Sequence, residues 1–290
     1  MASAARNPRH RIDGLAVDAI PADDRGVLYG DGVFRTLRID DGRPWAFEQQ
    51  VATLQRDAAR LQLPLHANLA HAIREDFAAL AGADSGVLRI TLTRGSGRRG
   101  YAAPAAPQPR RLATFTSGRA GLGNAVGESL GVAATPVSVS PVLAGVKHLG
   151  RLDQVLAASE VMPESVFDRL MLDPEGHLVC GTRCNLFLRF GETLRTPAVD
   201  RTGVAGVMRA RIMAGQFADA HASLVQVEAI SLGVDALTEA DEIFVTNSVF
   251  GAQAIARVVG RDGQVLFQEN AHPVADALVR AIESELGAPC

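Results

Sequence analysis

Apolar and polar positions recur along the chain with two different periods, which predict a mixture of helices and strands. Over 48–63, Val51, Leu54, Ala58 and Leu61 fall on one side of a helical repeat, which predicts an amphipathic helix. Period-two alternation and short buried runs indicate strands elsewhere. The same reading predicts helices at 69–80, 207–220 and 273–286 and a helix or turn at 232–240. It predicts strands at 33–39, 87–93, 112–116, 225–229 and 242–246, a hairpin of 168–172 and 177–190 around a turn at 173–176, and a strand pair around 254–267.

A further helical stripe follows Lys147. Leu149, Leu152, Val155 and Leu156 repeat at helical spacing, so we expect a helix with a buried apolar side directly after the lysine. Lys147 then lies at a junction between an irregular stretch and that helix. A lysine at such a place is usually a solvated charge.

The length of 290 residues allows two domains, each with its own core. A glycine-rich, apolar-poor stretch divides the predicted elements and is typical of an interdomain linker. We therefore expect an N-terminal domain over 1–118, a linker over 119–127 and a larger C-terminal domain over 128–290. Both domains mix helices and strands, which indicates an α/β protein.

Composition and charge exclude several classes. A formal net charge of -3 argues against a nucleic-acid or anionic-membrane partner. No apolar run approaches the roughly 20 residues of a membrane span, and residues 1–11 lack the apolar core of a signal peptide and resemble a frayed arm. Cys180 and Cys184 would lie roughly 13 Å apart on one strand, too far for a disulfide. A cytoplasmic protein without a metal site is expected.

Two stretches have the composition of anion-binding loops. Arg94 begins a glycine-rich loop that also contains Arg98 and Arg99, and guanidinium groups bind carboxylates in a bidentate manner. Gly206-Val207-Met208 opens a predicted helix, whose first N–H groups could hold a phosphate. An exposed flexible loop and an ordinary turn are the alternatives for these two stretches.

Four passages in order resemble the class IV pyridoxal-phosphate enzymes, the branched-chain and D-amino acid aminotransferase family. They are Asp24-Arg25-Gly26 through Gly30-Asp31-Gly32-Val33-Phe34, the Arg94 loop, the Lys147 segment, and Asn185-Leu186-Phe187 with Gly206-Val207-Met208-Arg209. The resemblance implies a two-domain class IV aminotransferase fold, like that of D-amino acid aminotransferases, and a homodimer. It also implies pyridoxal 5'-phosphate bound to Lys147 as a Schiff base, with Lys147 then acting as general base.

The resemblance also assigns roles to other residues. The Arg94 loop is more similar to that of the family's lyases than to that of its aminotransferases, so a lyase is the expected activity. Asn247-Ser248, after a predicted strand, resembles the second phosphate-binding turn of the family, with an ordinary turn as the alternative. The implied substrate contacts are Tyr29, Arg94 and Arg99, and the implied cofactor contacts are Gly206, Val207, Met208, Asn247 and Ser248.

Two positions depart from the family pattern. Cys180 stands where the family has a glutamate that pairs with the pyridine nitrogen of the cofactor, and a thiol cannot supply that carboxylate. Thr53 stands where an arginine grips the phosphate, and Arg56, three residues on, is expected to replace it. These departures leave two alternatives to the lyase: a branched-chain or D-amino acid aminotransferase, and a catalytically idle homologue.

Overall fold

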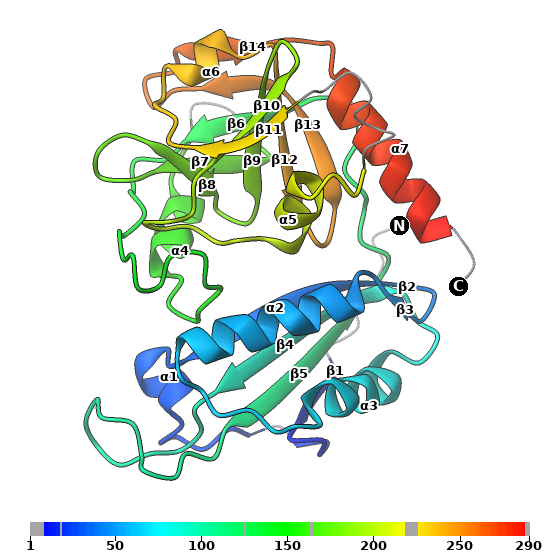
Figure 1. Ribbon diagram of the computed structural model, residues 1–290, viewed down its shortest axis with the longest axis vertical. Coiled ribbons are helices and arrows are strands. Elements are labelled where there is room, and N and C mark those ends of the chain that lie inside the picture. The colour runs from blue at the N-terminus through cyan, green and yellow to red at the C-terminus, as the bar shows by residue number, and fades with distance from the viewer. Residues whose placement is uncertain (1–8, 18, 125, 163–164, 218–225, 288–290) are drawn as a thin grey trace. The chain divides into compact units, whose positions relative to one another are not determined.

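The structure is a computed structural model that describes residues 9–17, 19–124, 126–162, 165–217 and 226–287. Contacts between residues divide the chain into two compact units (Figure 1). Unit 1 comprises residues 1–121 and 146–150, and unit 2 comprises residues 122–145 and 151–290. The lysine segment, residues 146–150, thus packs with the N-terminal part of the chain, whereas the sequence analysis assigns it to the C-terminal domain.

Unit 1 is an antiparallel sheet with strand order β1-β5-β4-β2-β3, accompanied by three helices (Figure 1). Strand β1 pairs with β5, so the chain is part of the sheet from Arg9 onward, where a frayed arm was expected; residues 1–8 lie outside the described ranges. The elements are β1 Arg9–Ile12, α1 Arg25–Tyr29, β2 Gly32–Asp40, β3 Arg43–Pro44, α2 Phe47–Arg60, α3 Leu69–Ala81, β4 Gly86–Thr93 and β5 Arg110–Ser117.

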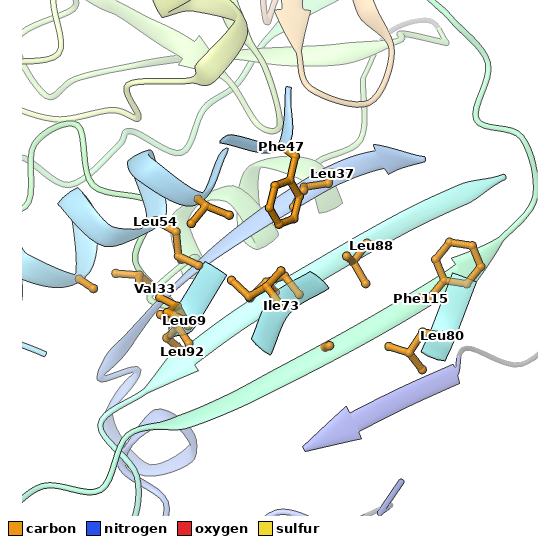
Figure 2. Packing of buried hydrophobic residues seen from close by; sticks show 14 of the residues in the cluster. Val33, Leu37, Phe47, Leu54, Leu69, Ile73, Leu80, Leu88, Leu92 and Phe115 are labelled. Atoms are coloured by element: carbon orange, nitrogen blue, oxygen red, sulfur yellow. The ribbon is translucent and has the colours of Figure 1, made fainter. Parts of the chain in front are cut away.

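Helices α2 and α3 cover one face of this sheet and enclose its core. Val51, Leu54 and Ala58 of α2 are buried, as the helical period predicts, and Leu61 is partly buried against the same cluster. Figure 2 shows Leu54 and Ile73 of the two helices packed toward side chains of the central strands. Burial of each large aliphatic side chain stabilises unit 1 by about 1.5–3 kcal/mol.

The lysine segment lies beside strand β2. Val33 and His148 form an antiparallel bridge, the Phe34 N–H donates to the Lys147 carbonyl at 3.0 Å, and the Leu149 N–H donates to the Gly32 carbonyl at 3.0 Å. The segment is therefore extended, and helix α4 begins only at Leu152 and ends at Ser159. The prediction that the helical stripe starts at Leu149 was wrong, because bonding to β2 competes with helix formation.

The predicted burial of that stripe was also wrong. Leu152, Val155 and Leu156 are more than half exposed in the single chain, and Ala157 is the buried residue of α4. These three side chains do lie on one side of α4, but that side faces away from the core of unit 2.

Unit 2 is built on a nine-stranded mixed sheet with the order β11-β10-β9-β12-β13-β6-β7-β8, and β14 pairs with β13. Helix α5 packs against β12, and α7 lies along β13 (Figure 1). The predicted helix 207–220 ends at Met213, and residues 218–220 lie outside the described ranges. The elements are β6 Glu128–Val132, α4, β7 Asp168–Leu172, β8 Leu178–Gly181, β9 Asn185–Phe190, β10 Thr193–Pro197, α5 Val207–Met213, β11 Gln226–Ile230, α6 Ala236–Glu239, β12 Glu242–Asn247, β13 Gly251–Val259, β14 Val265–Gln268 and α7 Pro273–Gly287.

The predicted strand over 177–190 is two strands: β8 pairs with β7 and forms the predicted hairpin, whereas β9 pairs with β10 and β12. Strand β8 ends at Gly181, β9 begins at Asn185, and the Gly181 N–H donates to the Cys184 carbonyl at 2.9 Å. Cys180 and Cys184 thus flank a tight turn, so the expected separation along one extended strand was wrong. Both thiols are free.

None of the helices in the described ranges combines the length and apolar composition that a bilayer crossing requires.

Candidate active site

Lys147 is the only lysine in the 290-residue sequence; every other residue counted as lysine or arginine is an arginine. Its carbonyl accepts the Phe34 N–H, and its own N–H donates to Asp57 Oδ2 at 2.9 Å. The half-buried side chain places Nζ 4.6 Å from the centroid of the Phe34 ring. Unit 1 therefore fixes the main chain of the lysine on both sides and holds its amine against an aromatic face.

Asp57 is a functional candidate that the sequence analysis missed. It lies on the buried side of α2, and its side chain is 1% exposed. Oδ2 accepts from Arg35 of β2 as well as from Lys147, and Oδ1 accepts from Arg56 Nη2 at 3.0 Å. The signal was present, because a carboxylate between Leu54 and Ala58 interrupts an apolar helix face and demands a cation across the fold.

Arg56 lies on the exposed side of α2. Its side chain is 53% exposed and is paired with Asp57, while Thr53 is half-buried one turn earlier. Arg56 is thus fixed near the lysine segment through Asp57. Its contact with a phosphate stays a prediction.

Arg94 binds protein groups in the structure. Nε and Nη2 donate to the two oxygens of Asp31, and the guanidinium also donates to the carbonyls of Leu61 and Gln62. Burial raises the pKa of the Asp31 carboxyl, but hydrogen bonds from Arg94 and Arg25 outweigh it and hold that pKa below its ordinary value. This cluster anchors the base of the glycine-rich loop.

The tip of the loop is held by Arg25 and leaves Arg99 in solvent. Arg25 donates to the carbonyls of Gly100 and Tyr101, and the Gly100 N–H donates to the Tyr29 hydroxyl at 3.3 Å. Arg99 is exposed and makes no hydrogen bond or ion pair with any residue that the structure describes. Tyr29 is partly exposed, so both side chains can reach a molecule in solvent.

In unit 2, Cys180 lies in an apolar cluster with Met171 and Val179. Beyond the turn, the Cys184 thiol donates to Asp168 Oδ2 at 3.1 Å. Burial, together with the negative charge of Asp168, raises the pKa of the Cys184 thiol well above its ordinary value. Asp168 and burial therefore keep a neutral thiol at Cys184.

The start of α5 is shaped by Asn185. Asn185 Nδ2 donates to the Val204 carbonyl at 2.8 Å, and a Cβ at position 206 would collide with Asn185 Oδ1, so glycine is required there. The side chains of Val207 and Met208 are buried, which leaves only their backbone groups for a ligand.

The end of β12 lies beside this point. Thr246 is directly opposite Asn185 in the sheet, and its buried Oγ1 has no hydrogen-bond partner among the described residues. Asn247 Oδ1 accepts the N–H groups of Val249 and Phe250, while Ser248 is half-buried in the same turn. Unit 2 thus brings together Gly206, the Asn247-Ser248 turn and an orphaned hydroxyl.

One further cluster has the side chains of a metal site. The ligand atoms of Asp173, Glu175 and His177 lie within 4.8 Å of one another. Arg201 donates to Glu175 Oε2 at 2.6 Å, and this hydrogen bond and charge hold the pKa of Glu175 below its ordinary value. The single guanidinium of Arg201 thus already pairs with both carboxylates of this turn.

Comparisons with known proteins identify the family and the fold. The family described as Amino-transferase class IV matches residues 32–258. Aminodeoxychorismate lyase of Vibrio harveyi is 29% identical over 258 residues, which are 88% of this chain and 93% of that protein. The crystal structure of 4-amino-4-deoxychorismate lyase from Pseudomonas aeruginosa is 34% identical, with a TM-score of 0.80, and covers 96% of this chain and 97% of that chain.

A more distant solved structure shares the fold alone. The branched-chain aminotransferase from the thermophilic archaeon Thermoproteus uzoniensis, solved with norvaline, is 20% identical, with a TM-score of 0.79, and covers 96% of this chain and 94% of that chain. The predicted mixed α/β class IV aminotransferase fold is confirmed by these matches.

Proposed function

Because this chain belongs to the class IV aminotransferase family, whose members use pyridoxal phosphate, we propose that it is an aminodeoxychorismate lyase. The proposed reaction converts 4-amino-4-deoxychorismate into 4-aminobenzoate and pyruvate, a step toward folate. The observation that carries the proposal is Lys147. A chain with a single lysine has that lysine in the family segment, with its main chain bonded on both sides and its amine over an aromatic ring.

The residues present fit pyridoxal phosphate. An ε-amine can hold the aldehyde of the cofactor covalently. In unit 2, the Gly206 N–H already donates to the Val204 carbonyl at 3.0 Å, but the backbone N–H groups of Val207 and Met208 and the Asn247-Ser248 turn suit a phosphate. The Thr246 hydroxyl, which has no hydrogen-bond partner among the described residues, is a donor for one of its oxygens. We assign the phosphate to these residues, together with Arg56.

When bound, the cofactor supplies an electron sink for the substrate amine. Lys147 Nζ would hold the cofactor and would take the substrate proton as general base. The C–O bond to the enolpyruvyl group breaks, the released enolpyruvate takes up one proton to become pyruvate, and the ring becomes aromatic, which provides much of the driving force. The demand for a strongly electron-withdrawing cofactor is therefore smaller than in transamination.

Cys180 is the residue that favours the lyase over an aminotransferase. We assign it to the position beside the pyridine nitrogen, where a buried thiol among apolar side chains supplies no carboxylate. Such a site tolerates elimination better than the carbanion chemistry of transamination.

The substrate carries carboxylates, which we assign mainly to Arg99. Its guanidinium is exposed and has no partner among the described residues, whereas the guanidinium of Arg94 is already bound to Asp31. Arg94 then contributes to substrate binding chiefly by holding the loop. Tyr29, whose hydroxyl accepts the Gly100 N–H, completes the proposed substrate contacts.

We also propose a cytoplasmic homodimer. The exposed apolar side of α4 at Leu152, Val155 and Leu156 is suited to burial against a second copy of the chain. The free thiols of Cys180 and Cys184 suit a reducing compartment.

The decisive experiment is an assay of the purified protein with pyridoxal phosphate and 4-amino-4-deoxychorismate, without any added 2-oxo acid. The proposal expects equal amounts of 4-aminobenzoate and pyruvate. Brisk keto-acid formation from leucine or D-alanine, with no pyruvate from aminodeoxychorismate, would establish an aminotransferase. Absence of both activities and of a visible cofactor band would indicate an idle homologue.

A further inference from the structure

Helix α2 is hydrogen-bonded to the lysine segment through the side chain of Asp57. Asp57 Oδ2 lies 2.9 Å from the Lys147 backbone nitrogen, and the Phe34 N–H holds the Lys147 carbonyl from β2. The two peptide groups on either side of the Lys147 Cα are therefore fixed by different elements. The Lys147 Cα, from which the side chain extends, is thus held by hydrogen bonds on both sides, as it would be in a strand.

We propose that Asp57 is a positioning residue for Lys147. It touches no reacting atom, and it acts by fixing the Lys147 main chain so that Nζ stays over the Phe34 ring. The inference rests on the proposed function, because it gives Lys147 the covalent and proton-transfer roles. A misplacement of about 1 Å at such a group can cost as much as a hundredfold in rate.

Arg35 explains how a carboxylate can serve at this buried place. Its side chain is 3% exposed and that of Asp57 is 1% exposed, and the two form an ion pair. An isolated buried carboxylate would be strongly unfavourable, whereas a paired one with its remaining lone pairs occupied is stable. Strand β2 thus supplies two adjacent residues, Phe34 beneath the amine and Arg35 on the carboxylate that holds the lysine.

The test must separate the Asp57–Lys147 hydrogen bond from the Arg35–Asp57 ion pair, because removal of Asp57 alone leaves the buried Arg35 charge without its carboxylate. Two double variants achieve this separation: Arg35→Met with Asp57→Asn, and Arg35→Met with Asp57→Leu. Both lack the ion pair and have similar side-chain volume at position 57, but only the asparagine can accept the Lys147 N–H. Asp76→Asn is the matched control, since Asp76 is another buried carboxylate of unit 1, paired with Arg11 and Arg111.

The first readout is hydrogen exchange of the Lys147 amide in the full chain, with and without pyridoxal phosphate. We expect exchange about tenfold faster in the leucine variant than in the asparagine variant. The second readout is the pH midpoint of the lysine-bound chromophore, together with kcat and KM. The leucine variant should have a displaced midpoint and a kcat lower by about tenfold at unchanged KM. Asp76→Asn should melt earlier without altering any of these values at Lys147.

Equal Lys147 exchange, chromophore midpoint and kcat in the two double variants would overturn the inference. If the leucine variant does not fold, Asp57→Glu replaces it, because glutamate keeps the charge for Arg35 but moves the oxygen that accepts the Lys147 N–H. Asp57→Glu should change Lys147 exchange, chromophore midpoint and kcat in the same directions. Unchanged values in Asp57→Glu would equally overturn the inference. If borohydride leaves Lys147 of the wild type unlabelled, the proposed function fails, whereas the cofactor-free exchange still reports on the Asp57–Lys147 bond. Labelled Lys147 with equal double variants leaves the function standing and removes the role of Asp57.

Discussion

Asp57 in unit 1 and Asp168 in unit 2 are both buried carboxylates, but their hydrogen-bond donors differ. Asp57 accepts from the guanidinium groups of Arg35 and Arg56 and from the Lys147 N–H. Asp168 accepts from the Thr182 hydroxyl and the Cys184 thiol, together with backbone N–H groups. One carboxylate is neutralised by cations, and the other is solvated by neutral dipoles.

This difference separates the two chemical needs of the proposed site. The lysine region contains a carboxylate that two guanidinium groups hold in place and that accepts the main-chain N–H of the lysine. The region around Cys180 keeps a neutral thiol at Cys184, and the side chains clustered with Cys180 are apolar, so that cluster brings no charge to a cofactor ring assigned to Cys180. The two regions thus differ in their charges. In unit 1, Arg35 and Asp57 form a buried ion pair, whereas in unit 2 the thiol of Cys180 stands where the family pattern has a charged glutamate.

Removal of the lysine tests the first region most severely. Lys147→Ala should abolish covalent attachment of the cofactor and all pyruvate release, because no other ε-amine exists in the chain. Borohydride reduction followed by peptide mapping measures the attachment. A reduced cofactor found instead on the α-amino group of the wild type would contradict the assignment.

A substitution at Arg56 tests whether this residue, besides pairing with Asp57, also binds the phosphate of the cofactor. Arg56→Ala should weaken pyridoxal-phosphate binding by about 1.5–3 kcal/mol, the value of a charged hydrogen bond. Fluorescence titration of the cofactor-free protein gives the affinity, with Arg60→Ala on the same helix as control. An unchanged affinity would restrict Arg56 to its pairing with Asp57.

Cys180 tests whether the region around it selects the reaction. Cys180→Glu should raise transamination of leucine or D-alanine by about tenfold, corresponding to ~1.4 kcal/mol at the transition state, and should change lyase turnover less. Cys180→Ser controls for loss of the thiol without gain of an acid. Parallel assays of pyruvate and keto-acid formation measure both rates, and an equal rise in the two activities would contradict the role of this position.

The Cys184 thiol gives the smallest predicted effect, through pH. Above about pH 9, an unfolded Cys184 loses its proton, whereas burial and Asp168 raise the pKa of the folded thiol and keep it protonated. The unfolded state then binds fewer protons, so the free energy of unfolding should fall as pH rises, by at most about 1.4 kcal/mol per pH unit. Urea denaturation between about pH 8 and 10 should show a shallower decline in Cys184→Ser, and identical slopes would contradict the prediction.

Elements governed by a local period could be predicted from the sequence. Helix α2 was predicted over 48–63 and spans Phe47–Arg60, because its apolar residues recur at helical spacing. Strand β4, predicted over 87–93, spans Gly86–Thr93 for the corresponding reason. The assignment of Lys147 as the cofactor lysine comes from its family segment and stays a prediction.

Features that depend on distant partners could not be predicted. The lysine segment has the spacing of a helix but bonds to β2, more than a hundred residues earlier in the chain. Asp57 interrupts an apolar helix face, and its meaning appears only once Arg35 and Lys147 are brought to it by the fold. The turn between Cys180 and Cys184 could not be predicted, because it lacks the asparagine-glycine pair that is typical of a tight turn.

The division of the chain at residues 146–150 has a consequence for synthesis on the ribosome. Residues 1–121 emerge first and contain all five strands of the unit 1 sheet, yet Asp57 at that stage has no Lys147 N–H to accept. The lysine segment joins that sheet only after the ribosome has also translated residues 122–145. In the nascent first unit, Asp57 can therefore pair with Arg35 and Arg56, but its hydrogen bond to the lysine main chain forms only after the segment has been translated.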